Sequence, residues 1–189
     1  MSIKTHKDEL EEIIDAVIKL TWNYKIFRVL FEKGEVDFET RQAHPEIFLT
    51  LHDSLFCSFC VAADLLFEEK PSATSLWSLV RKSQPILATK LNEKIRGNKS
   101  LLEKIGAIRN QVCAHRWQKK SPQEVFAEVK LRVSMMAEIV DLARSVILDL
   151  AEEIDAGRKT ELEKQQLSEL TLRCVADDAA KILQAFRNC

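Results

Sequence analysis

The stretch FAEVKLRVSMMAEIVDLARSVILDLAEEI, residues 126–154, decides the fold class of this chain. Its apolar residues recur in alternating steps of three and four, the heptad spacing of a helix that packs against other helices. Further apolar residues widen this stripe, so we expect a central bundle helix rather than one strand of a two-stranded coil. The stripe consists of Phe126, Val129, Val133, Met136, Val140, Ala143, Ile147, Leu150 and Ile154.

Local signals place this long helix at about residues 122–157. Ser121-Pro122-Gln123-Glu124 is a capping box with proline at the first helical position, and Gly157 can end the helix. A helix before this boundary is expected over about residues 98–118. A C-terminal helix is expected over about residues 161–187.

The N-terminal half shows the same kind of spacing. Apolar residues at helical intervals predict a long helix over residues 10–31 and a second one over residues 45–69, with shorter helices near 76–80 and 86–96. The chain contains only four Gly and four Pro, too few for a β protein with many turns. We therefore expect an all-α bundle of about six helices that forms one domain over residues 1–189.

Composition excludes several classes of protein. Hydrophobic residues make up 46% of the chain and are spread along it, which argues against disorder. We find no leading apolar run with a cleavage site and no apolar stretch of about 18 residues. The sequence therefore predicts a cytoplasmic protein that does not enter the membrane.

The five cysteines are expected to be reduced thiols, because their number is odd and no secretion signal accompanies them. Cys57 and Cys60 match a C-x-x-C pattern, but they lie among apolar residues in the middle of a predicted helix. A redox pair usually lies at a helix start, and a zinc site needs further ligands. We interpret both as small core residues and expect no metal site.

Residues 108–117, IRNQVCAHRW, carry the most suggestive chemistry. They place Arg109, Asn110 and His115 within seven positions near the predicted end of a helix. This stretch lies inside residues 81–120, which hold eleven Lys/Arg and two Asp/Glu in a chain whose net charge is −1. A one-signed charge field around a candidate site favours a polyanionic partner.

The segment Arg109-Asn110-x-x-x-Ala114-His115 resembles the R-x(4–6)-H signature of HEPN domains. Residues 21–27, TWNYKIF, and 52–56, HDSLF, resemble the U-type abortive-infection (Abi) branch of that superfamily. The resemblance implies a HEPN-like helical fold, a homodimer with facing motifs, and a metal-independent RNase that acts in phage defence or as a toxin. An antitoxin or nucleotidyltransferase partner would then be a separate chain.

The chemistry of the residues agrees with such a reaction. RNA carries its own nucleophile, the 2′-hydroxyl beside the scissile phosphate. His115 can exchange a proton near neutral pH, Arg109 can hold phosphate oxygens through a planar fork of donors, and Asn110 can orient the histidine or donate to the phosphate. No metal or cofactor is needed, and the expected partner is RNA, with tRNA as one candidate. Candidate RNA contacts outside this catalytic group are Arg116, Trp117, Lys119 and Lys120.

Geometry does not by itself bring the two main residues together. On an ideal α-helix, residues six apart point about 120° away from each other and lie ~9 Å apart along the axis. Arg109 and His115 therefore meet only if the helix loosens or if a symmetric dimer brings one chain's histidine to the other's arginine. The sequence also leaves open a module that binds RNA or a nucleotide without cutting it, or a helical scaffold for dimerisation and interaction. In the simplest case Arg109 only pairs with an acidic residue of a neighbouring helix, and His115 only caps a helix end.

Overall fold

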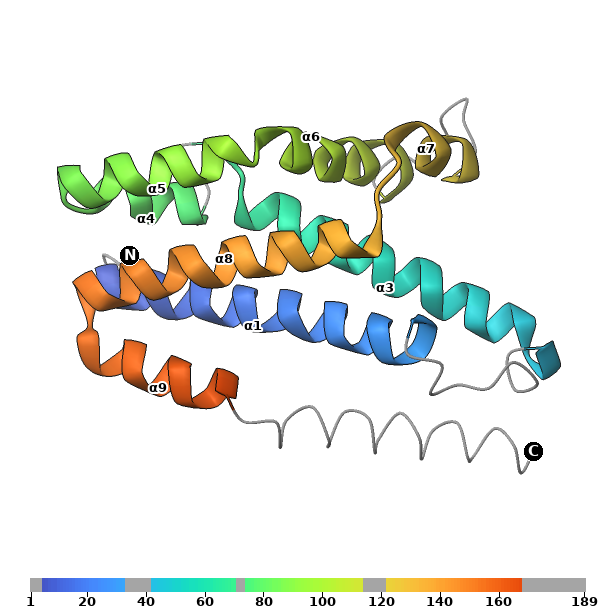
Figure 1. Cartoon of the computed structure of the whole chain (residues 1–189), viewed down its shortest axis with the longest axis horizontal. Coiled ribbons are helices and arrows are strands. Elements are labelled where there is room, and N and C mark those ends of the chain that lie inside the picture. Colours follow the sequence, from blue (N-terminus) through green and yellow to red (C-terminus); the bar gives the residue numbers. More distant parts are fainter. Residues whose placement is uncertain (1–4, 33–41, 71–73, 114–121, 168–189) are drawn as a thin grey trace.

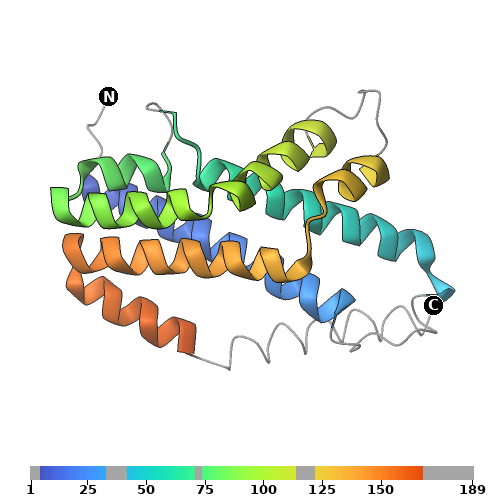
Figure 2. The ribbon, with the colours of Figure 1, turned by 45° about the horizontal axis from the view of Figure 1, so that its top comes forward.

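The computed structural model describes residues 5–32, 42–70, 74–113 and 122–167 of the chain. Every regular element in these four ranges is a helix, and none is a strand, so the expected all-α bundle is confirmed. Figure 1 shows the arrangement of the helices, and Figure 2 shows it from a second direction.

Two long helices form the middle of the bundle. Helix α1 (His6–Phe31) and helix α8 (Val133–Ile154) lie side by side and run in opposite directions (Figures 1 and 2). Their apolar stripes face the core, as the spacing of the sequence predicted. Residues that each helix buries almost completely include Leu10, Ile13, Ile14 and Leu20 of α1 and Met136, Ile139, Ala143 and Val146 of α8.

Helix α3 (Pro45–Leu66) crosses the other side of α1 and carries the two cysteines of the C-x-x-C pattern. Cys60 is fully buried beside Phe59, and Cys57 is half-buried against the same core, which confirms their interpretation as core residues. Contrary to expectation, this part of the chain is long and apolar enough to cross a membrane by length and composition. Core helices of soluble proteins pass the same test.

Three shorter helices form a layer along the top of Figure 1: α4 (Leu76–Lys82), α5 (Pro85–Gly97) and α6 (Lys99–Ile108). Buried Ser75 fixes the start of this layer, because its hydroxyl donates to the backbone carbonyl of Glu68 at 2.7 Å. Since α6 also packs on α3, this layer and the end of α3 together enclose the candidate site.

The structure corrects the predicted continuous helix over residues 122–157. Helix α7 (Pro122–Val129) ends where Lys130 takes a left-handed conformation with φ 52°, and Arg132 is extended. The backbone therefore turns between α7 and α8. As a result, α7 lies beside α6 in the upper layer, while α8 descends to the centre (Figure 1).

The C-terminal helix also begins earlier than the predicted residues 161–187. Helix α9 starts at Ala156, with a single residue between it and α8, and is described as far as Leu167. That residue is Asp155, and its carboxylate accepts the backbone N–H of Arg158 at 3.4 Å. Gly157 therefore belongs to the first turn of α9 instead of ending the helix before it. The predicted residues after Leu167 lie outside the described part.

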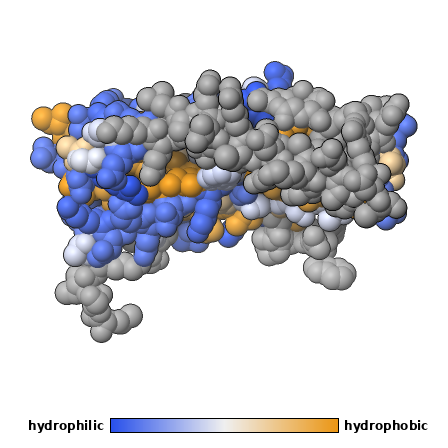
Figure 3. All heavy atoms as spheres, turned by 90° about the horizontal axis from the view of Figure 1, so that it is seen from below, coloured by the Kyte–Doolittle hydropathy of each residue, from blue (hydrophilic) through white to orange (hydrophobic). Residues whose placement is uncertain are grey.

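Charged side chains join the helix ends at one end of the bundle. Figure 3 shows hydrophilic residues over this end, on the left of that view. Such exposed ion pairs contribute only about 0–1 kcal/mol each, so they orient α9 and α4 more than they stabilise the fold. The pairs are Lys7–Asp155 at 3.0 Å, Glu11–Arg158 at 2.9 Å and Glu9–Lys82 at 2.5 Å.

Candidate functional site

The described part of the chain contains two of the three predicted catalytic residues. Arg109 and Asn110 directly follow the last residue of α6, and both line a cleft. The third, His115, lies outside the described residues. So do the four predicted RNA contacts, Arg116, Trp117, Lys119 and Lys120.

The helix changes its geometry at the candidate motif. Residues Arg109–Cys113 form a π-helical turn, η1, which directly continues α6. Such turns are rare and occur frequently at functional sites. Buried Ile108 and Val112 anchor the turn in the core, and η1 also packs against α3 and α7. The helix predicted over residues 98–118 is therefore an α-helix only as far as Ile108 and continues as a π turn to Cys113. Its predicted residues after Cys113 lie outside the described part of the chain.

Arg109 is held by two neighbours. Its Nη1 donates to Oδ1 of Asn110 at 2.8 Å, and its Nε lies 3.6 Å from Oδ2 of Asp64 on α3. Arg109 therefore pairs with an acidic residue of a neighbouring helix. The side chain of Arg109 remains 35% exposed, so this pairing leaves part of the guanidinium open to solvent.

Asp64 was not predicted as a site residue, although its position in the sequence carries a signal. Asp64 is a lone acid in the apolar run VAADLLF, residues 61–67, near the end of α3. An acid in such a run is either exposed or paired, because burying an unpaired charge is costly. Here burial raises the pKa of Asp64, and Arg109 partly offsets this by lowering it.

Gly106 gives the Asp64 carboxylate its space. A side chain at this position of α6 would place its Cβ 3.1 Å from Oδ1 of Asp64. This distance is tighter than ordinary van der Waals contact, so any larger residue would push the carboxylate away. Gly106 and Arg109 are three residues apart, and the chain therefore presents both to the same carboxylate.

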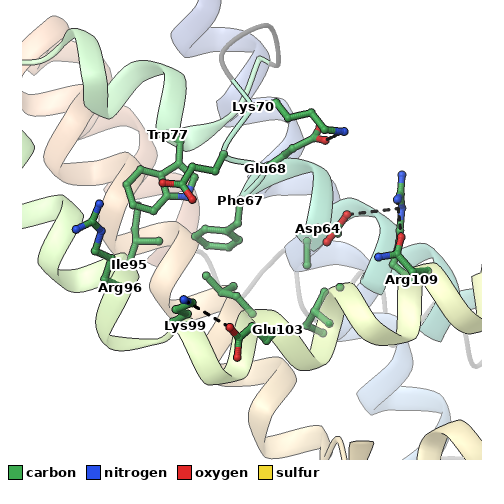
Figure 4. Close-up of a pocket in the computed structure, with 16 residues that line it drawn as sticks. Asp64, Phe67, Glu68, Lys70, Trp77, Ile95, Arg96, Lys99, Glu103 and Arg109 are labelled. Carbon is green, nitrogen blue, oxygen red and sulfur yellow. Dashed lines mark hydrogen bonds and ion pairs between the residues drawn. The ribbon is translucent and has the colours of Figure 1, made fainter.

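The cleft beside this cluster has a volume of about 920 Å³. Figure 4 shows Asp64 and Arg109 at one end and Trp77 and Arg96 at the other, with Lys99 and Glu103 between them. Trp77 and Phe67 are almost completely buried, so they give the cleft an aromatic wall rather than freely exposed rings.

Charges in the cleft are balanced. Acidic and basic residues line it in equal number, and several of them pair: Lys70 lies 2.6 Å from Glu68, and Lys99 lies 3.7 Å from Glu103. The positive charge of residues 81–120 therefore does not dominate the described walls of this cleft. The basic residues of the lining are Lys70, Arg96, Lys99 and Arg109, and the acidic ones are Asp64, Glu68, Glu69 and Glu103.

Residues 21–27 and residues 52–56 meet in the structure. Phe27 of α1 and His52 of α3 lie with ring centroids 5.1 Å apart, and Phe31 and Phe56 complete an aromatic cluster around the imidazole. The Nδ1 atom of His52 lies 3.1 Å from Oδ1 of Asp53. The aromatic cluster joins α1 to α3, and its residues are not among those that line the Arg109 cleft.

Within the four described ranges, no group of three or more His, Cys, Asp or Glu side chains is placed to hold a metal ion. Comparison of the chain with models of known families, with curated proteins and with solved structures found no match.

Proposed function

We propose that this protein is a metal-independent HEPN-type endoribonuclease that cleaves RNA by transesterification. The observation that carries the proposal is the placement of Arg109 and Asn110 on the π turn at one end of a large cleft. In this reaction Arg109 stabilises charge on the phosphoryl group, Asn110 orients the arginine, and His115 exchanges the proton. The resemblance of residues 109–115 to the R-x(4–6)-H signature supports the assignment.

Arg109 retains the donors that this role needs. A guanidinium has five N–H groups, of which one points toward Asp64 and one is given to Asn110. Three remain without a partner among the described residues, and they can bind phosphate oxygens while the Asp64 pair stays intact. The ion pair with Asp64 restricts the side chain of Arg109 before RNA binds. This side chain therefore loses less conformational entropy on binding.

The proposal includes a homodimer in which the two motifs face each other, acting on RNA in the cytoplasm. A symmetric pair of chains can supply the histidine of one motif to the arginine of the other. The biological setting proposed is phage defence or toxicity, with an antitoxin or nucleotidyltransferase as a separate chain. These elements rest on the family resemblance.

The test is cleavage of tRNA and of unstructured RNA in excess EDTA. Wild type is expected to cut RNA and to leave 2′,3′-cyclic phosphate ends, because the neighbouring 2′-hydroxyl is the nucleophile. His115→Ala is expected to reduce the rate by roughly 10²–10⁴, the usual contribution of a general acid or base. The matched control is His6→Ala, since His6 is an exposed histidine at the start of α1. Equal cleavage by wild type and His115→Ala rules out the catalytic assignment.

A second candidate function is the binding of RNA or a nucleotide without cleavage. What favours it is the part of the Arg109 guanidinium that stays open to solvent beside the cleft, since this group can hold a phosphate without any proton transfer. In this case wild type binds RNA with a salt-sensitive affinity, yields no products over long incubation, and loses affinity in Arg109→Gln. RNA affinity no stronger than that of a neutral control protein would contradict both functions and leave an interaction scaffold.

A further inference from the structure

One continuous helical face forms the floor of the Arg109 cleft. Helices α5 and α6 are separated only by Asn98, and the π turn directly continues α6. The residues of these elements that line the cleft include a series in steps of three and four, the spacing of one side of a helix. The floor therefore runs without interruption from α5 to the candidate motif. The residues of this series are Arg96, Lys99, Glu103, Gly106 and Asn110.

Arg96 and Arg109 lie at opposite ends of this floor (Figure 4). The two residues are 13 positions apart in the chain, which corresponds to about 20 Å on a straight α-helix. In a stacked nucleic-acid strand successive phosphates advance by about 3.4 Å, so this length spans up to about six nucleotides. A ligand that touches both arginines is therefore an oligomer and not a single nucleotide.

Arg96 differs from the other basic residues of the cleft. Lys70, Lys99 and Arg109 each have an acidic partner. Arg96 is exposed, and it makes no hydrogen bond or ion pair with the part of the chain that the structure describes. The five N–H donors of its guanidinium are therefore available to an anion, and a planar fork of donors suits phosphate oxygens.

The residues next to Arg96 fit the same ligand. Lys99 lies three positions further along the same face, and its pair with Glu103 is long, at 3.7 Å, with both side chains largely exposed. Such a surface pair contributes little, so Lys99 can exchange Glu103 for a phosphate. The Glu103 carboxylate can then accept an amino group of a base. Cations at the ends of the floor and an acid between them suit a strand that alternates phosphates and bases.

We infer that the cleft holds a single strand of RNA along its length, with Arg109 on the scissile phosphate and Arg96 on a phosphate a few nucleotides away. Because Arg109 is taken as the place of cleavage, the inference rests on the proposed function. The volume of about 920 Å³ lies at the upper end of the range of about 300–1,000 Å³ for small-molecule sites, which suits a few unpaired nucleotides and not a duplex. Arg96 is in this view a residue that binds the substrate and takes no part in the chemical step.

The experiment compares Arg96→Gln with Arg132→Gln. Arg132 is an exposed arginine that does not line the cleft, so both variants lose the same charge. All proteins carry His115→Ala, so that bound RNA stays intact, and fluorescence anisotropy measures the affinity for a trinucleotide and a dodecanucleotide of uridine in EDTA. Arg96→Gln is expected to bind the dodecanucleotide roughly tenfold more weakly than the His115→Ala parent, since a charged hydrogen bond is lost. Its affinity for the trinucleotide, which cannot reach both arginines, is expected to stay nearly unchanged, and Arg132→Gln is expected to match the parent with both.

Salt dependence gives a readout that a structural role of Arg96 does not change. For single strands each neutralised phosphate contributes about −0.7 to the slope of log K against log salt concentration. Arg96→Gln is therefore expected to make this slope shallower by about 0.7 for the dodecanucleotide, whereas Arg132→Gln and the charge-preserving Arg96→Lys keep the slope of the parent. If Arg96 only stabilises the end of α5, Arg96→Gln lowers the unfolding temperature and leaves the slope unchanged, which overturns the inference.

Two further outcomes overturn the inference. One is an equal loss of affinity in Arg96→Gln and Arg132→Gln, since this shows only a general effect of net charge. The other is an equal loss for the trinucleotide and the dodecanucleotide, since the two ends of the cleft would then not hold one strand.

Cleavage by the chain that keeps His115 separates this inference from the proposed function. There Arg96→Gln is expected to raise KM for the dodecanucleotide and to leave kcat unchanged, because Arg96 lies far from the scissile phosphate. RNA that is cut with no effect of Arg96→Gln on KM or affinity overturns the inference and leaves the nuclease standing. RNA that is bound through Arg96 in the length-dependent way but never cut contradicts the nuclease and supports the strand path along the cleft.

Discussion

Arg109 of the π turn and Asp64 of α3 form an ion pair between two neighbouring helices, with Nε and Oδ2 3.6 Å apart. The two residues are far apart in the sequence, and the packing of α6 on α3 brings them together. Burial disfavours the charged form of Asp64, and the positive charge of Arg109 favours it. The pair therefore positions the side chain of Arg109 rather than contributing much to stability.

The pH dependence of stability is expected to change in Asp64→Asn. Because burial raises the pKa of Asp64, the folded protein retains this proton at a higher pH than the unfolded chain does. The stability of wild type relative to Asp64→Asn is therefore expected to be highest in acid, to fall as the pH rises from about 4 through the raised pKa, and then to level off. Urea unfolding of both proteins at a series of pH values measures this. A stability difference that grows with pH would show that the attraction of Arg109 affects the pKa of Asp64 more than burial does.

Gly106→Ala is expected to stabilise the protein less than Gly97→Ala does. Alanine in a helix is favoured over glycine by up to about 1 kcal/mol. A Cβ at Gly97 meets nothing within 4 Å, whereas a Cβ at Gly106 lies 3.1 Å from Oδ1 of Asp64. Part of the gain at Gly106 is therefore lost in moving the carboxylate. Chemical unfolding of both variants gives the comparison, and a larger gain at Gly106 would mean that Asp64 moves without cost.

Lys130→Gly is expected to stabilise the junction of α7 and α8. Lys130 has a φ of 52°, a conformation that costs a residue with a side chain about 1–2 kcal/mol. Glycine removes this cost but loses about 0.5–1 kcal/mol through the greater freedom of the unfolded chain, so a net gain of up to about 1 kcal/mol follows. Lys130→Ala keeps the strain and serves as the control. Thermal unfolding that ranks alanine above glycine would contradict the left-handed turn.

The two cysteines of α3 are expected to differ in reactivity. Cys60 is fully buried, and burial raises the pKa of its thiol, whereas Cys57 is half-buried. In the folded protein an aromatic disulfide reagent is expected to modify Cys57 faster than Cys60, by roughly tenfold or more, because Cys60 reacts only when the structure opens. The measurement uses two variants that each keep one of these cysteines and carry serine at Cys113, Cys174 and Cys189. Equal rates of modification in urea serve as the control, because they show that the two thiols do not differ once the chain is unfolded. Equal rates in the folded protein would contradict the prediction.

The sequence predicted the helices well because their apolar spacing is a direct consequence of burial. It failed where the backbone turns without interrupting that spacing. Val129 and Val133 both pack against the core, although Lys130 ends one helix between them. Periodicity reports which residues are buried and does not report backbone direction, so α7 and α8 were joined. The one-residue connection at Asp155 was missed because Gly157 looked like a helix end.

The candidate site was predicted in part for a related reason. Arg109 and Asn110 are adjacent in the chain, and their residue types alone suggested phosphate chemistry. Asp64 and Gly106 belong to the site through contact between α3 and α6, which a single sequence does not reveal.

The π turn has a consequence for how the length of this chain can vary. Such a turn holds one residue more than an α-turn, so the segment Arg109–Cys113 can lose a residue and remain helical. A deletion there would rotate the following backbone by about 100° and shift it by ~1.5 Å along the axis. Two chains that differ by this single residue would therefore point their following side chains in different directions. The number of residues between an arginine and a histidine then predicts their relative directions only if the helix between them has the same type of turn.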